Sequence, residues 1–242
     1  MSLTPFLHLD APLAGLAAGD AVHLSAAQRS HLERVLRLAP GAVVEVADGA
    51  GWSAPGVLTE GGVRLTGDAR LTPEPTPRLV LAQGLPKGRK LDEVLRQATE
   101  LGVDEVRVLT TARSVPRLEG DRGARARGRW EAVVWAASEQ SRRTRRPSVR
   151  GPLSLERCVG PEEVVLVAHP GAPGLPRVAQ EVTGAPAVVL AVGPEGGFTD
   201  EEVADAVTSG ALAVGLGQAV LRTEHAGPAG LAVLSAVVGR WG

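Results

Sequence analysis

In the first third of the chain, short hydrophobic segments alternate with turn residues, a pattern that predicts a small β-rich unit with one helix. Ser25 is the expected N-cap of the helix, because Gln28 three residues later completes a capping box. The sequence Ala39-Pro40-Gly41 is expected to end it. Glycine-containing turns separate the predicted strands. These strands cover residues 42–47, 52–59 and 62–71.

From residue 79 onward, hydrophobic strands alternate with amphipathic helices, which is typical of a parallel sheet covered by helices. Three alternate prolines, Pro73, Pro75 and Pro77, precede this change and favour an extended spacer. We therefore expect two domains, 1–72 and 73–242. The segment 186–192 is apolar throughout and predicts a strand buried on both faces. The other predicted strands are 79–83, 105–110, 164–168 and 211–214, and the predicted helices are 90–101, 125–140, 199–207 and 227–239.

The composition is that of a folded protein: the 242 residues are 44% hydrophobic and 22% charged, too apolar for a disordered chain. No apolar run approaches the about 20 residues of a membrane-spanning helix, and the first residues do not resemble a signal peptide. The single cysteine, Cys158, excludes an intramolecular disulfide and fits a reducing compartment. The five histidines have no metal-ligand spacing. We expect a cytoplasmic protein with no membrane association and no bound metal.

Positive charge is concentrated in one stretch, although the formal net charge is −1. Residues 113–150 contain eleven arginines and four carboxylates. Such clustering is typical of a protein that binds a phosphate-rich partner, and a solvated surface in an arginine-rich chain is the alternative. At the end of a predicted helix the run has more arginines than helix capping requires, which favours phosphate contact. The arginines concerned are Arg142, Arg143, Arg145 and Arg146.

Three segments follow predicted strands, at the edge of a parallel sheet where ligands bind. His169 follows one strand, Gly193–Gly197 follows the buried strand, and Gly215–Glu224 follows the last one. The glycines of Gly193–Gly197 let a ligand approach the main chain, although the loop lacks the lysine and spacing of a P-loop. These three segments are candidates for one shared pocket.

A structural role explains the glycine loop equally well, and it explains the segment around Arg222 better than a functional role does when that segment is taken alone. The loop Gly193–Gly197 also fits a tight strand-to-helix turn that requires positive φ angles. Arg222 and Glu224 flank Thr223 at a predicted helix start, where an acidic residue and a threonine cap are both favourable. Pro228 fits the first turn of that helix.

Four motifs together resemble the RsmE family of ribosomal RNA uridine methyltransferases, within the SPOUT (trefoil-knotted) superfamily. In the family's order and spacing they are GLPKGRKLDEVLRQATELGV at 84–103, EQSRRTRR at 139–146, VGPEGGF at 192–198 and LGQAVLRTE at 216–224. HLERVLRL at 31–38 resembles the entry to the family's PUA-like RNA-binding domain. The sequence departs from the family pattern just after Glu224, where His225, Gly227 and Pro228 replace a Thr-Ala start.

The resemblance implies an α/β fold in which a knotted, SPOUT-type parallel-sheet methyltransferase domain follows a small β-rich PUA-like domain. It also implies a homodimer that uses S-adenosylmethionine to methylate N3 of a specific uridine in small-subunit (16S) ribosomal RNA, as free RNA or in a ribosomal particle. Two alternatives are an RNA-binding module with an inactive transferase pocket, and a knotted methyltransferase that acts on ribose 2′-OH or on transfer RNA.

Uridine N3 bears a proton, so the implied reaction needs a base and a group that stabilises negative charge. Glu195 and Glu224 are the candidate bases, and Arg222 is the candidate stabiliser. The cofactor pocket is expected to contain His169, Gly193, Pro194, Gly196, Gly197, Leu216, Gly217, Leu221 and Thr223. RNA phosphates are expected to bind Lys87, Lys90, Arg34, Arg37 and the arginine run 142–146. A solvated helix face is the alternative for Arg34 and Arg37.

Overall fold

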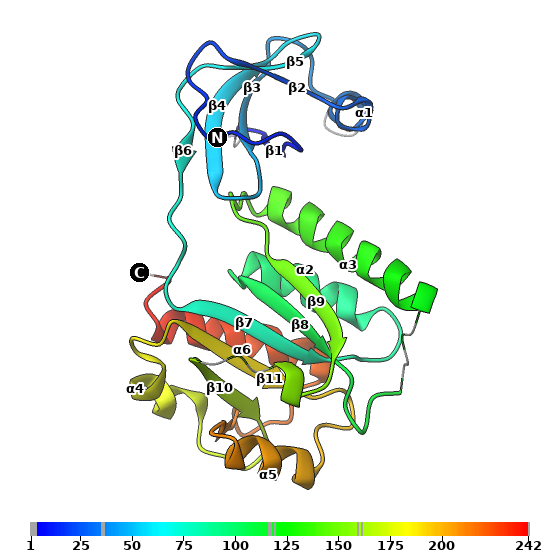
Figure 1. Ribbon diagram of the computed structural model, residues 1–242, viewed down its shortest axis with the longest axis vertical. Coiled ribbons are helices and arrows are strands. Elements are labelled where there is room, and N and C mark those ends of the chain that lie inside the picture. The colour runs from blue at the N-terminus through cyan, green and yellow to red at the C-terminus, as the bar shows by residue number, and fades with distance from the viewer. Residues whose placement is uncertain are drawn as a thin grey trace. The chain divides into compact units, whose positions relative to one another are not determined.

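The computed structural model describes residues 4–34, 37–115, 118, 120–158, 160 and 162–241 (Figure 1). The chain forms two compact units, Met1–Glu74 with Ser138–Arg146, and Pro75–Ala137 with Pro147–Gly242. These units differ from the expected domains 1–72 and 73–242 in two respects: the boundary lies after Glu74, and a later segment joins the first unit. Ser138–Arg146 belongs to the first unit because its side chains and backbone bond to the strands of that unit.

The first unit is a six-stranded sheet with one helix. Its order is β1-β3-β4-β5-β2, with β6 beside β4. The strands are β1 (Phe6–His8), β2 (Ala21–His23), β3 (Val43–Ala47), β4 (Trp52–Leu58), β5 (Gly62–Leu65) and β6 (Arg70–Leu71). The predicted strand 62–71 is interrupted by a bend at 66–67 and forms both β5 and β6. Helix α1 (Ala26–Arg34) begins with the predicted capping box, because the Ser25 and Gln28 side chains each accept a backbone N–H of the other residue.

The second unit contains a six-stranded sheet of order β12-β10-β11-β7-β8-β9, and every neighbouring pair is parallel. Its strands are β7 (Arg78–Gly84), β8 (Glu105–Leu109), β9 (Ser148–Leu153), β10 (Glu163–Ala168), β11 (Ala187–Val192) and β12 (Leu212–Val214). Every residue of β11 is buried, which confirms the prediction from its apolar run. Strand β9 was not predicted. It is an edge strand that contains Gly151 and Pro152 and is only partly buried.

Helices cover both faces of this sheet (Figure 1). Helices α2 (Lys90–Glu100), α3 (Gly120–Gln140) and α6 (Thr223–Val237) pack on the face that includes Leu79 and Leu81. Helix α5 (Asp200–Thr208) packs on the face that includes Val165 and Val189. The predicted capping box of Thr199 and Glu202 is present at its start. Three short elements complete the unit: the 3-10 helices η1 (Glu156–Cys158) and η2 (Leu175–Val178), and α4 (Ala179–Val182).

Helix α6 begins four residues earlier than the sequence predicted. Its N-cap is Arg222, whose side chain makes no capping hydrogen bond, so the prediction that Thr223 caps the helix was wrong. Pro228 lies inside the helix rather than in its first turn. The Thr223 hydroxyl bonds to other parts of the unit instead of to the helix terminus.

Candidate active site

A cavity of about 630 Å³ lies in the second unit, at the carboxyl ends of β10, β11 and β12. Its volume is within the range of about 300–1,000 Å³ that is typical of small-molecule sites. The loops after these three strands line it together with the first residues of α2 and α6. All the predicted catalytic and cofactor residues lie there: His169, Gly193, Pro194, Glu195, Gly196, Gly197, Leu216, Gly217, Leu221, Arg222, Thr223 and Glu224.

The buried Thr223 side chain joins the segments that form this cavity. Its Oγ1 donates to the carbonyl oxygen of Gly193 over 2.7 Å and accepts from Gln83 Nε2 over 2.9 Å. The start of α6 is thereby fixed to the ends of β7 and β11. Gln83, which is fully buried, was not identified from the sequence, although a polar residue at the end of the apolar run 79–82 is a usable signal.

The glycine loop after β11 requires a residue without a side chain at one position in particular. A Cβ added at Gly193 would lie 2.7–2.9 Å from backbone atoms of Gly197 and Phe198. The Arg113 side chain supports the same loop by donating to the carbonyl oxygens of Gly196 (2.7 Å) and Phe198 (3.1 Å). Nothing in the sequence pattern identified Arg113 for this role.

The segment Leu216–Leu221 offers its backbone to a ligand. Within the described chain, no hydrogen bond joins these residues to other protein groups, so their N–H and C=O groups are available at the cavity wall. Leu216 and Leu221 add apolar surface. A cofactor with an adenine ring, which has an apolar face and an edge of donors and acceptors, fits such a lining.

Lys90, the first residue of α2, bridges two carboxylates at the cavity. Its Nζ lies 3.2 Å from Glu195 Oε1 and 3.3 Å from Glu224 Oε2. The backbone N–H of Lys87 also donates to Glu195 Oε1, over 3.1 Å. Lys90 was predicted to bind phosphate, but its ammonium group is paired with both candidate bases because α2 begins beside the start of α6.

These contacts change the pKa values of the cluster. The hydrogen bond to Glu195 raises the pKa of Lys90; partial desolvation opposes this shift, and Glu224 adds to it. Partial burial alone would raise the pKa of Glu195, but hydrogen bonds from its own backbone N–H, from Lys87 and from Lys90 lower it overall. The pKa of Glu224 is lowered by its own backbone N–H and by Lys90. Both carboxylates are therefore ionised at neutral pH.

Arg222 and His169 lie at the same cavity without a charged partner in the described chain. The Arg222 side chain is exposed and has no hydrogen bond or ion pair there. His169 Nδ1 donates to the carbonyl oxygen of Pro170 over 2.8 Å. The guanidinium of Arg222 is thus available to a substrate, while the His169 ring is held at the cavity wall.

The arginine run 142–146 is bonded within the first unit. Arg142 Nη2 lies 2.8 Å from Glu45 Oε2. Arg145 Nη2 donates to the carbonyl oxygen of Thr72 over 2.9 Å, and Arg146 Nη2 to that of Asp48 over 3.3 Å. The backbone carbonyl of Arg143 accepts from a buried histidine of β1. Much of the donor capacity of the run is used inside the unit, and phosphate binding by these arginines stays a prediction.

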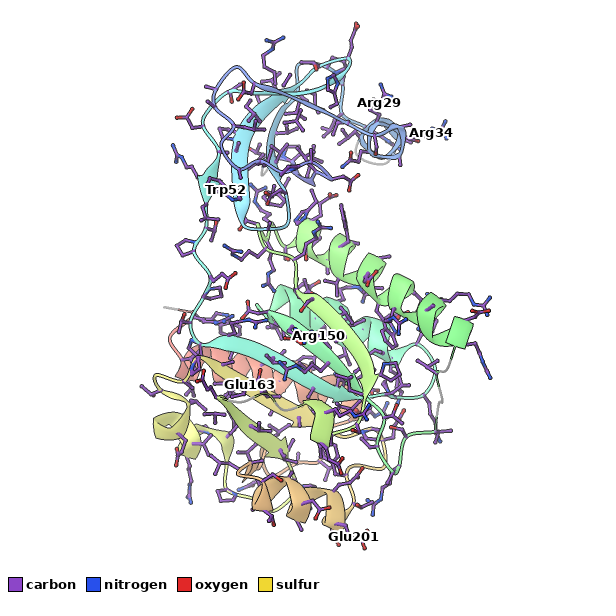
Figure 2. All side chains as sticks on the ribbon, in the orientation of Figure 1. Arg29, Arg34, Trp52, Arg150, Glu163 and Glu201 are labelled. Atoms are coloured by element: carbon purple, nitrogen blue, oxygen red, sulfur yellow. The ribbon has the colours of Figure 1, made fainter. Side chains whose placement is uncertain are left out.

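The remaining predicted RNA-binding residues are exposed. Arg34 extends from α1 into solvent (Figure 2). Arg37 is also exposed, but it lies beyond the described end of α1 with a φ of 54°, so it does not continue the face of that helix. Lys87 is exposed between β7 and α2.

Two further observations bear on the kind of site. Among the residues described, no group of three or more His, Cys, Asp or Glu side chains could hold a metal ion. None of the described helices has the length and apolar character needed to cross a membrane.

The fold and the cavity define a class of protein, the α/β enzymes that bind a small cofactor beyond the ends of parallel strands and present acid–base groups beside it. A family model described as an RNA methyltransferase domain matches residues 72–235. The chain belongs to this family of RNA methyltransferases, and within it to the RsmE family, whose members are named ribosomal RNA small subunit methyltransferase E.

The similarity extends over most of the chain. The enzyme of that name from Synechocystis is 34% identical over 90% of this chain and 73% of its own length. The one from Mycobacterium bovis is 36% identical over 87% of this chain and 84% of its own. The structure of the Neisseria gonorrhoeae protein bound to S-adenosyl methionine is 28% identical, with a TM-score of 0.85 over 98% of both chains. The chain therefore has the two-domain α/β fold of this family.

Proposed function

We propose that this protein transfers the methyl group of S-adenosylmethionine to N3 of a uridine in small-subunit (16S) ribosomal RNA. The observation that carries the proposal is the cavity at the ends of β10–β12, where Arg222, Glu195 and Glu224 lie together. The names of the relatives and the cofactor bound by the Neisseria gonorrhoeae protein support it. When bound, S-adenosylmethionine supplies a methyl group on a positively charged sulfur.

The lining of the cavity would hold the cofactor through backbone groups and apolar side chains. The unpaired N–H and C=O groups of Leu216–Leu221 suit the edge of an adenine ring. Leu216 and Val192 provide apolar contact and exclude water. Such positioning of the reacting groups is worth about 7–11 kcal/mol when the geometry is well aligned.

The charged residues would perform the proton chemistry at the uridine base. A carboxylate oxygen of Glu195 or Glu224 accepts the proton of uridine N3, a step that contributes about 10²–10⁴-fold. Lys90 stays paired with the other carboxylate while one of them is protonated. The available guanidinium of Arg222 stabilises the negative charge that develops on the carbonyl oxygens beside N3.

We further propose that the protein acts as a homodimer in the cytoplasm, where its proposed substrate occurs, and that the first unit is its PUA-like RNA-binding domain. Exposed apolar side chains just before α6 and farther along it support the dimer, because a partner subunit would cover them. Val220 is 88% exposed, Leu221 37% and Val233 38%. Sedimentation of the wild type and of Val233→Glu tests the dimer, which the variant is expected to weaken.

Modification mapping tests the proposed reaction. Small-subunit ribosomal RNA from cells with and without the gene is digested and analysed by mass spectrometry, and the purified protein is titrated with S-adenosylmethionine by calorimetry. We expect one N3-methyluridine to disappear with the gene and to return when the purified protein is incubated with that RNA. Loss of a ribose 2′-O-methyl group or of a transfer RNA modification would contradict the proposal, as would absence of cofactor binding.

A further inference from the structure

The first half of α3 carries exposed arginines that belong to the basic stretch 113–150 but lie outside the run 142–146. Arg122, Arg125 and Arg129 are spaced by three and four residues, so they lie on one face of the helix. All three are exposed, and the side chain of Arg129 is 46% exposed. Arg127 is exposed as well, beside this face.

The guanidinium groups at the start of this face are available to a partner. In the described part of the chain, Arg122 and Arg125 make no side-chain hydrogen bond or ion pair. Asp121 and Glu131 are the acidic residues of the helix on either side of the arginines, and neither forms an ion pair with them in the described chain. This distinguishes Arg122 and Arg125 from the run 142–146, in which the guanidinium groups of Arg142, Arg145 and Arg146 bond within the first unit.

A shared carboxylate connects this face to the start of α2. Arg129 Nε lies 3.1 Å from Asp92 Oδ1, and Arg89 Nε lies 3.3 Å from Asp92 Oδ2. The Arg89 side chain is 84% exposed. Arg89 directly precedes Lys90, which lines the cavity. Positive charge therefore continues from α3 through Arg129 and Arg89 to the cavity.

We propose that Arg122, Arg125, Arg129 and Arg89 form a phosphate-binding track for the RNA strand whose uridine enters the cavity. The proposal rests on the proposed function, because it takes RNA as the substrate. Along α3 the track spans about 10 Å, since seven residues rise by about 1.5 Å each. Arginine suits this role because its planar fork of donors matches a phosphate group.

The test compares two double variants with the same change in charge. Arg122→Gln/Arg125→Gln removes two track arginines and leaves the ion pairs of Asp92 intact. Arg157→Gln/Arg177→Gln removes two exposed arginines in η1 and η2, away from α3. The probe is an unmodified transcript of small-subunit ribosomal RNA, whose affinity for each protein is measured between 50 and 200 mM salt. Calorimetric titration with S-adenosylmethionine checks the cavity of each variant.

We expect the track variant to bind the transcript about tenfold more weakly at 100 mM salt, with a salt slope reduced by about 1.4 for two lost contacts to a single strand. Cofactor binding should be unchanged, and the control variant should bind RNA like the wild type. An unaltered salt slope in the track variant, or an equal reduction in the control, would overturn the proposal. A wild-type protein that binds the transcript but methylates neither it nor small-subunit particles from cells lacking the gene would refute the proposed function instead, and the salt slopes would still decide the track.

Discussion

The hydroxyl of Thr223 donates a hydrogen bond of 2.7 Å to the carbonyl oxygen of Gly193. This bond joins the first residue of α6 to the loop after β11, two segments separated by 30 positions in the sequence. Since Gln83 donates to the same hydroxyl, three chain segments depend on one buried side chain. The shape of the cavity therefore depends on a residue that the sequence predicted as a helix cap.

Thr223→Val should destabilise the protein by about 1–3 kcal/mol, because the buried Gln83 amide and the half-buried Gly193 carbonyl each lose a hydrogen bond. It should also weaken binding of S-adenosylmethionine, which calorimetry and urea unfolding together can measure. Thr208→Val is the control. The Thr208 hydroxyl donates to the Ala204 carbonyl in an exposed helix, where a change of less than about 0.5 kcal/mol is expected. Equal effects of the two variants would contradict the role of Thr223.

Gly193→Ala should abolish cofactor binding and cost about 1–3 kcal/mol of stability, because the new Cβ would overlap backbone atoms that cannot move aside. Gly128→Ala on α3 provides the opposite case. A Cβ there meets nothing within 4 Å, and alanine in a helix is expected to stabilise by about 0.5–1 kcal/mol. Thermal unfolding and calorimetry distinguish the two. A Gly193→Ala protein that binds the cofactor normally would show that the loop tolerates a side chain.

Lys90→Met should move the acidic limb of the pH–activity profile to higher pH. In the wild type, the lowered pKa values of Glu195 and Glu224 keep both groups charged above the usual glutamate value of about 4.3, and their pairing is lost only as the pH falls below it. The raised pKa of Lys90 keeps its charge until the pH exceeds about 10.4. Lys90→Arg keeps a positive charge at this position and should retain the acidic limb of the wild-type pH–activity profile. Identical profiles for all three proteins would exclude Lys90 from the proton chemistry.

Arg222→Ala should lower kcat by about 10²–10³-fold, because a charge-stabilising group is lost from the transition state. The side chain is exposed, so stability should change by less than about 0.5 kcal/mol. Single-turnover methylation of the transcript and urea unfolding measure the two effects. Arg177→Ala, another exposed arginine of the same unit, should leave both unchanged. Near-normal turnover in Arg222→Ala would remove this residue from the mechanism.

The first unit should lose stability in mild acid through His8. Burial lowers the pKa of His8 to about 4, against a hydrogen bond in which Nε2 donates to the Arg143 carbonyl over 2.8 Å. The unfolded chain therefore binds a proton at His8 near pH 6.5, whereas the folded unit binds it only near pH 4. The stability of the unit is full above about pH 6.5 and falls toward pH 4, by at most about 3 kcal/mol. Urea unfolding at pH 7.5 and 5 measures this. His8→Gln should show a smaller difference, and an equal one would contradict the assignment.

The buried apolar elements could be predicted from the sequence, and the polar connections could not. Strand β11 followed from a run of apolar residues that only a fully buried strand explains. Strand β9 was missed because Gly151 and Pro152 interrupt any strand pattern. The capping boxes at Ser25 and Thr199 are local and were confirmed.

In the cavity, the residues followed from their position after strands, but their partners did not. The rule that ligands bind at the carboxyl ends of parallel strands places Glu195 and Glu224 near each other. It does not indicate that Lys90 lies between them. The same holds for the arginine run 142–146, whose contacts with Glu45 of β3 and with Asp48 in the turn after β3 join residues about 100 positions apart. Local sequence carries no information about such long-range pairs.

The placement of Ser138–Arg146 in the first unit has a consequence for how the protein is made. On the ribosome, residues up to Glu74 emerge well before the segment that supplies Arg142 to Glu45 and the Arg143 carbonyl to His8. The first unit therefore cannot form all of its contacts until more than half of the polypeptide has been synthesised. A gene truncated after the proline-rich spacer would therefore encode a first unit that lacks the segment Ser138–Arg146.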